Sequence, residues 1–132
     1  MLKSYCNIET GFVDSIQRES MRRLKPGKWL NDEVINYYFV LLRKRDAELM
    51  KDAVSSGSTK RRSHFFQSFF MSKLLDTHDT RTYKYDNVKN WSQSVPGGDI
   101  FELNSIFTPI NMDNIHWGCA EIAMQEKTNS VL

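Results

Sequence analysis

Cysteine is scarce in this sequence, and long hydrophobic runs are absent. The two cysteines, Cys6 and Cys119, stand too far apart for a zinc knuckle or a redox pair, and no pattern indicates a disulfide between them. Residues 1–4 lead into polar residues rather than a hydrophobic signal segment, and the longest apolar stretch, residues 34–42, is too short to span a bilayer. These shortages predict a soluble intracellular protein in a reducing compartment, with no membrane partner.

A strong charge of one sign is also missing. The net charge is only +2, which predicts no global attraction to nucleic acid. Basic residues do cluster at 22–23, 43–45 and 60–62, and we interpret these clusters as solvated faces or loops rather than as a nucleic-acid patch. With 40% apolar and 26% charged residues, the 132-residue chain has the composition of one folded domain.

A long helix is predicted after a turn at residues 24–28, where a proline is followed by a glycine. Asn31 is a suitable N-cap, and Asp32 and Glu33 lie where the positive end of the helix dipole favours acids. The helix should extend to about Ala53. Apolar side chains cover nearly all of the circumference of its first half, which predicts a buried central helix.

The rest of the chain predicts shorter elements. They are an irregular leader at 1–20, a loop at 55–62, a strand entering a helix at 64–75, a loop at 76–80, helical turns at 83–91, a loop at 92–98, and strands at 100–101, 106–110 and 116–124, the last two forming a hairpin. Helices come first and strands follow, which indicates an α+β domain with helices packed on a sheet. His64 and His78 lie beside loops and are interpreted as solvated rather than as metal ligands.

One dipeptide near the end of the chain, His116-Trp117, has the character of a catalytic site. It opens the second strand of the predicted hairpin, after Pro109-Ile-Asn and a short polar turn. Histidine is the side chain best suited to act as a general base near neutral pH, and a neighbouring tryptophan can wall a narrow groove.

Several other short sequence blocks precede this dipeptide along the chain. They are Leu24-x-Pro-Gly-x-Trp-Leu-Asn-Asp-x-Val-Ile-Asn, Phe66-Gln-Ser-Phe-Phe, Val88-x-x-Trp, Asp99-Ile-Phe and Pro109-Ile-Asn, followed by His116-Trp itself. In this order the chain resembles the ubiquitin-like-protein-specific proteases, the sentrin/SUMO-specific cysteine proteases, from about Met21 to about Ile122. The resemblance implies a papain-like fold, here incomplete, with helices packed on a partial mixed sheet. It also implies that residues 21–132 are the N-terminal portion of the catalytic domain.

The resemblance assigns roles to four residues. His116 matches the catalytic histidine, which takes the proton of a cysteine thiol. Trp29 and Trp117 match two tryptophans that form a tunnel around the C-terminal Gly-Gly of the modifier. Asp32 matches a position that meets a basic residue on the modifier. Four aromatic residues are implied to be core: Phe66, Phe69, Phe70 and Trp91. The implied partner is SUMO or another ubiquitin-like modifier, with neither cofactor nor metal, and the implied location is the nucleus, with the cytoplasm as the alternative.

Three parts of the family's catalytic apparatus have no match in these 132 residues. They are the aspartate that orients the histidine, the glutamine of the oxyanion hole and the nucleophilic cysteine. Because nucleophile, base and oxyanion donors act as a unit, we expect the chain as given to be inactive. Because the matching family domain is considerably longer, we also expect poor solubility or partial unfolding when the chain is expressed alone. Cys119 cannot replace the nucleophile, because three positions along a strand put its side chain on the face opposite His116, and nothing suggests that Cys6 is activated.

A noncatalytic reading stays open beside the protease. In it, Trp29, Asp32 and Trp117 hold a ubiquitin-like modifier without cutting it. A third reading, a nucleic-acid binder using residues 60–62, has little in its favour.

Overall fold

The computed structural model describes residues 5–6, 13–14, 16–75, 82–124 and 128–131. Its main feature is a four-stranded sheet in the order β3-β4-β5-β6. The strands are β3 (His64–Phe65), β4 (Ser105–Met112), β5 (His116–Ala123) and β6 (Thr128–Val131). The β3–β4 pair is parallel and the other two pairs are antiparallel. The predicted α+β class with a mixed sheet is confirmed.

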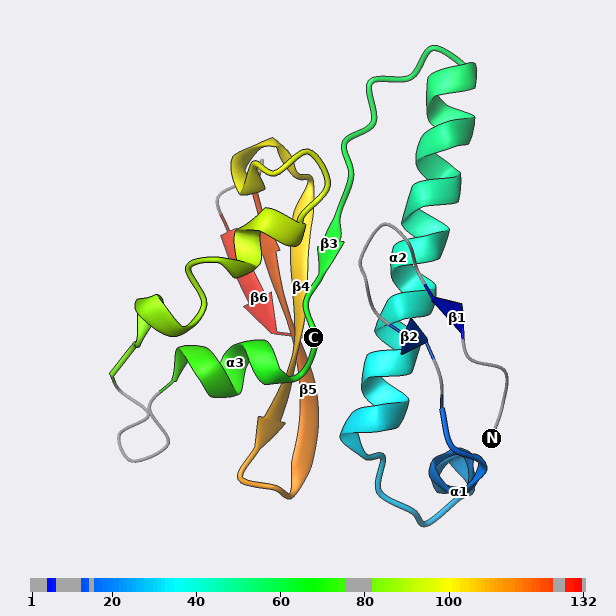
Figure 1. Ribbon diagram of the computed structural model, residues 1–132, viewed down its shortest axis with the longest axis vertical. Coiled ribbons are helices and arrows are strands. Elements are labelled where there is room, and N and C mark those ends of the chain that lie inside the picture. Colours follow the sequence, from blue (N-terminus) through cyan, green and yellow to red (C-terminus); the bar gives the residue numbers. More distant parts are fainter. Residues whose placement is uncertain (1–4, 7–12, 15, 76–81, 125–127, 132) are drawn as a thin grey trace.

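Helices lie on both sides of this sheet (Figure 1). The long helix α2 (Asp32–Ser55) stands on the β3 side, and α3 (Phe69–Leu74) stands on the other. Three 3₁₀ turns follow α3, namely η2 (Tyr85–Asn87), η3 (Trp91–Ser94) and η4 (Ile100–Glu102). Before α2 come β1 (Tyr5–Cys6) paired with β2 (Val13–Asp14), then α1 (Arg18–Met21) and η1 (Arg22–Leu24). The described part of residues 1–20 is therefore not wholly irregular.

The apolar core lies between the sheet and the α3–η4 layer. Phe66, Val95, Leu103 and Ile106 are buried there, with Phe70 and Trp91 packed against them. The rings of Phe66 and Phe70 stack with centroids 4.1 Å apart. The assignment of Phe69 to this core is wrong, since its side chain is 49% exposed at the start of α3.

Two further predictions about secondary structure need correction, and a third lies outside the described residues. Residues 100–101 are not a strand but the start of η4, because the Asp99 carboxylate accepts the backbone N–H of Phe101 and caps a helical turn. The apolar spacing over 83–91 produces short 3₁₀ turns rather than a continuous helix. The predicted loop at 76–80 and His78 lie outside the described residues.

The long helix begins as the sequence predicts. Asn31 is its N-cap, and the side-chain oxygen of Asn31 accepts the backbone N–H of Val34 at 3.0 Å. The prediction that this helix is buried all round is wrong, since Tyr38 is 56% exposed and Leu41 and Leu49 are exposed with it. At helical spacing, those three residues lie on one face of α2, and Asn36, Val40 and Arg43 lie on the opposite face. Among the described residues, only the Asn36 face meets the sheet edge.

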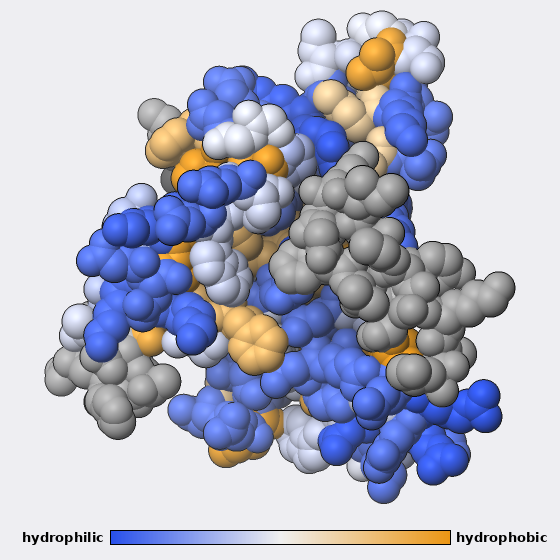
Figure 2. All heavy atoms as spheres, in the orientation of Figure 1, coloured by the Kyte–Doolittle hydropathy of each residue, from blue (hydrophilic) through white to orange (hydrophobic). Residues whose placement is uncertain are grey.

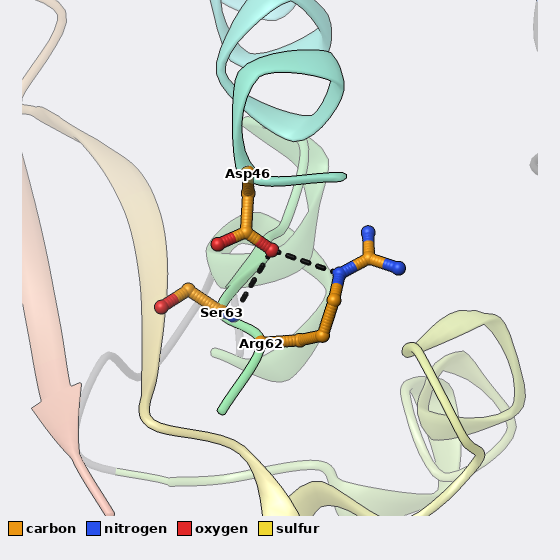
Figure 3. A network of polar contacts seen from close by, with 3 residues as sticks. All are labelled: Asp46, Arg62 and Ser63. Carbon is orange, nitrogen blue, oxygen red and sulfur yellow. Dashed lines mark hydrogen bonds and ion pairs between the residues drawn. The ribbon is translucent and has the colours of Figure 1, made fainter. Parts of the chain in front are cut away.

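That face of α2 holds the sheet through polar contacts. The Asn36 side chain accepts the N–H of Ser68 at 2.8 Å, and the Arg43 guanidinium donates to the Phe65 carbonyl through Nε at 2.7 Å. The Asp46 carboxylate accepts from Arg62 Nε at 3.0 Å and from the Ser63 N–H at 3.2 Å (Figure 3). Along the helix, the ten-residue step from Asn36 to Asp46 rises about 15 Å. Along the extended segment, the five-residue step from Ser63 to Ser68 spans about 16 Å. The two lengths therefore match, so that Asn36, Arg43 and Asp46 bind successive parts of the segment around β3.

Candidate modifier-binding site

A single hydrogen bond joins the two halves of the predicted site. The indole Nε1–H of Trp117, on β5, donates to the backbone carbonyl of Leu30 at 2.9 Å. Leu30 follows Trp29 directly and lies two residues before Asp32, and 87 residues of chain separate the donor from the acceptor. The Trp117 side chain is partly buried by this contact, whereas Trp29 is 61% exposed. The structure thus brings Trp117 beside the segment that carries Trp29 and Asp32.

The segment before α2 is held by a tight turn and by side-chain contacts. Lys25-Pro-Gly-Lys28 is a type II turn, in which the N–H of Lys28 donates to the carbonyl of Lys25 at 3.3 Å. Its third residue, Gly27, has a φ of 77°, the left-handed value that this turn requires and that glycine adopts without strain. Arg23 Nη1 then donates to the carbonyl of Trp29 at 3.4 Å. These contacts fix the backbone at Trp29 while its indole stays exposed.

The start of α2 is tied in turn to α1. The Glu33 carboxylate accepts the backbone N–H of Gln17 at 2.7 Å and the hydroxyl of Ser20 at 2.5 Å. The amide nitrogen of Asn31 donates to the same Ser20 hydroxyl at 3.1 Å. Asp32 opens the helix with an exposed side chain. An exposed carboxylate on a braced helix end is suited to meeting a cation on a docked protein.

His116 stands at the first position of β5, opposite Met112 on β4, with an exposed side chain. The preceding hairpin turn places it there, since Asp113 and Asn114 both adopt positive φ, at 55° and 57°. Short polar side chains tolerate that conformation better than others do. His116 and Trp117 are successive strand residues, so their side chains point to opposite faces of β5. The exposed imidazole therefore lies on the face of β5 away from the Trp117 indole.

Cys119 shares the Trp117 face of β5 rather than the His116 face. Burial, and secondarily the neighbouring Glu121 carboxylate, raise the pKa of the Cys119 thiol. A raised pKa lowers the thiolate fraction, and the thiolate is the nucleophile. Both the geometry and the pKa agree with the expectation that Cys119 is not the nucleophile of His116.

The interpretation of His64 as solvated is wrong. Its side chain is 3% exposed and lies edge-on to the Phe66 ring, with centroids 4.5 Å apart. Burial, followed by the charges of Arg43 and Arg62, lowers the pKa of His64 to about 3. The imidazole is therefore neutral, and its Nε2 has no hydrogen-bond partner. His64 is a buried residue of β3 that packs against Phe66 of the core, and it has no place in the site.

Sequence reasoning missed the residues that support the site. Asn36 interrupts an apolar run, Arg43 and Asp46 lie in a charged stretch, and nothing local indicates that the three bind the β3 segment. Within the described part of the chain, no group of three or more His, Cys, Asp or Glu residues could hold a metal ion. In the same part, no helix is both long and apolar enough to cross a membrane.

An exposed histidine thus opens β5 of an α+β scaffold, and the tryptophan that follows it is hydrogen-bonded to the segment that carries Trp29. Residues 28–132 match the family described as "Ulp1 protease family, C-terminal catalytic domain". The chain belongs to the Ulp1 protease family.

Known relatives agree with this membership. Ubiquitin-like-specific protease 1A of Arabidopsis thaliana is 42% identical over 108 residues, which cover 81% of this chain and 20% of that protein. Sentrin-specific protease 3 of Homo sapiens is 34% identical over 100 residues, which cover 76% of this chain and 13% of that protein. The chain thus spans about a fifth or less of the length of these relatives.

Solved structures show the same fold. SUMO protease Ulp1, with its catalytic cysteine oxidised to a sulfinic acid, superposes with a TM-score of 0.61 at 25% identity, over 89% of this chain and 44% of that one. The C-terminal Ulp1 protease domain in complex with Smt3, the yeast ortholog of SUMO, superposes with a TM-score of 0.59 at 25% identity, over 86% and 42%.

Proposed function

We propose that the protein is a cysteine-type peptidase and isopeptidase that cleaves after the C-terminal Gly-Gly of SUMO or another ubiquitin-like modifier. The observation that carries this proposal is the Trp117–Leu30 hydrogen bond, which brings the predicted base and one tunnel wall to the segment of the other wall. Family membership supports the reaction class, and the Ulp1 complex with Smt3 supports the class of partner.

Each site residue has a distinct part in the proposed reaction. His116 takes the proton of a cysteine thiol, and the thiolate attacks the carbonyl that follows Gly-Gly. A thioester forms, the lysine amine or precursor tail leaves with a proton, and water releases the modifier. Trp29 and Trp117 confine the diglycine, because a residue without a side chain is the one that fits between two indole rings. Asp32 binds a basic residue on the modifier surface and supplies affinity rather than chemistry.

The 132 residues on their own are proposed to be inactive. They supply the base but none of the partners that the resemblance requires, and catalytic groups that act as a unit lose nearly all activity when one is absent. We expect no covalent adduct between this polypeptide and SUMO carrying an electrophile at its C-terminus. An adduct at Cys6 or Cys119, located by peptide mass spectrometry, would contradict this.

Binding without cleavage is a second candidate function for the same residues. Two observations favour it. The Trp117 indole is bonded to the segment that carries Trp29 and Asp32. A catalytic partner for His116 is not among the described residues. Under either function SUMO should bind the chain.

The binding test uses matched aromatic variants. Trp29→Ala should weaken SUMO binding by about 30-fold, the loss typical of a buried aromatic anchor. Tyr85→Ala, which removes an exposed aromatic ring from η2, should change the affinity by less than about twofold. No measurable affinity in the wild-type chain, or equal losses in the two variants, would overturn the proposed site.

For location, we propose the nucleus, with the cytoplasm as the alternative, because sentrin-specific proteases are relatives. Imaging of a fluorescent fusion of the full protein tests this. Exclusion of the fusion from both compartments would refute it.

A further inference from the structure

Four cationic side chains surround a hollow beside the predicted diglycine clamp. The hollow has a volume of about 370 Å³ and is lined by Glu19, Arg22, Arg23, Lys25 and Lys28. Figure 2 shows strongly hydrophilic side chains gathered at this corner of the molecule, over α1 and the loop to α2. A volume of this size lies within the range of about 300–1,000 Å³ that is common for ligand sites.

The backbone brings these cations together. Lys25 and Lys28 occupy the first and last positions of the type II turn, so their Cα atoms are close. The N–H of Lys25 donates to the carbonyl of Arg22 at 3.2 Å, which joins this turn to the end of η1. Two consecutive hydrogen-bonded turns therefore hold Arg22, Lys25 and Lys28 around the hollow, although their positive charges repel one another.

Glu19 is the one carboxylate in the lining, and no ion pair joins it or another carboxylate to these cations within the described part of the chain. The ion pairs found there join Lys51 to Glu48, Arg61 to Glu102, Arg62 to Asp46 and Lys89 to Asp86. The nearby Glu33 carboxylate is already occupied by Gln17 and Ser20. Of the two other described basic runs, 60–62 is partly neutralised by the ion pairs of Arg61 and Arg62, and in 43–45 Arg43 is bonded to the Phe65 carbonyl. The hollow is therefore the stronger candidate for an anion.

We propose that this hollow binds an acidic stretch of a polypeptide. Several carboxylates, spaced along a peptide, can each reach one of the exposed cations, whereas a single small anion reaches only some of them. A peptide also brings backbone N–H donors for Glu19, the one carboxylate in the lining. The phosphates of a nucleic acid carry no such donors for Glu19. Because Arg23 also holds the Trp29 carbonyl, the bound segment lies next to the clamp without occupying it.

The test measures fluorescence anisotropy of a short labelled peptide of alternating Glu and Gly, titrated with the full chain. The Arg22→Gln, Lys25→Gln, Lys28→Gln triple variant should bind it about tenfold more weakly, from the loss of three surface charge pairs. The matched control carries Lys51→Gln, Lys60→Gln and Lys89→Gln, which remove the same charge elsewhere and should leave the affinity within about twofold. Circular dichroism melts should show that both triple variants fold as the wild type does.

Three outcomes would overturn the proposal. They are no binding by the wild type, equal losses in the two triple variants, and tighter binding of a single-stranded DNA of equal charge than of the peptide. The test does not depend on the protease function. Trp29→Ala should weaken the binding of SUMO and leave the affinity for the acidic peptide unchanged. Failure of one site is therefore distinguishable from failure of the other.

Discussion

The stability of the chain should fall steeply in mild acid because of His64. The pKa of this buried imidazole is about 3 in the folded chain, against an ordinary value of 6.5. The unfolded chain therefore takes up a proton first as the pH falls. The stability associated with neutral His64 is fully present above about pH 6.5 and is lost progressively towards pH 3. At pH 5 the loss amounts to about 2 kcal/mol, from about 1.4 kcal/mol per pH unit below 6.5.

Urea denaturation at pH 7.5 and pH 5 measures this loss. His64→Gln removes the titrating group, so its fall in unfolding free energy between the two pH values should be about 2 kcal/mol smaller than that of the wild type. Ser68→Ala is the matched control, because it removes a buried hydroxyl that also lacks a partner but does not titrate. Its difference between the two pH values should equal that of the wild type. Equal differences in the wild type and His64→Gln would refute the buried neutral imidazole.

Three other substitutions test the contacts that build the scaffold. Asp46→Ala should cost about 2–3 kcal/mol of unfolding free energy, because a buried carboxylate that accepts from two donors is lost. The control Glu48→Ala, at an exposed residue, should cost under about 0.5 kcal/mol. Similar costs in the two variants would contradict the role of Asp46. Asn31→Ala should cost about 1 kcal/mol in the same denaturation assay, and no cost would mean that the cap is not formed. Trp117→Phe keeps a ring but removes the donor to Leu30, and should cost about 1 kcal/mol in thermal melts and weaken SUMO binding; unchanged melts and binding would show that the bond is not needed.

Local features of the fold could be predicted from the sequence. The Asn31 cap depends on a hydrogen bond that reaches only three residues ahead, and the hairpin at β4 and β5 depends on two neighbouring apolar strands. The strand predicted at 100–101 is wrong for a similarly local reason, since a capping carboxylate at Asp99 outweighs strand propensity over two residues. Short-range chemistry decides such elements.

Features that depend on distant partners could not be predicted. His64 is buried against Phe66, and that burial, followed by the charges of Arg43 and Arg62, lowers its pKa; nothing adjacent to a loop histidine indicates this. The acceptor of the Trp117 indole is the Leu30 backbone carbonyl, which has no side-chain signature. Roles for Trp29 and Trp117 came from the resemblance, but the bond that brings Trp117 to the residue after Trp29 is visible only in the structure.

The central claim is that Trp29 and Trp117 form one clamp for the modifier's diglycine. A double-mutant cycle on SUMO binding by the full chain tests it most directly, using Trp29→Ala, Trp117→Ala and the pair. If the two rings grip the same two residues, the double variant should bind no more than about twofold more weakly than the weaker single variant. Losses that multiply would show that the two tryptophans act separately, and would contradict the clamp.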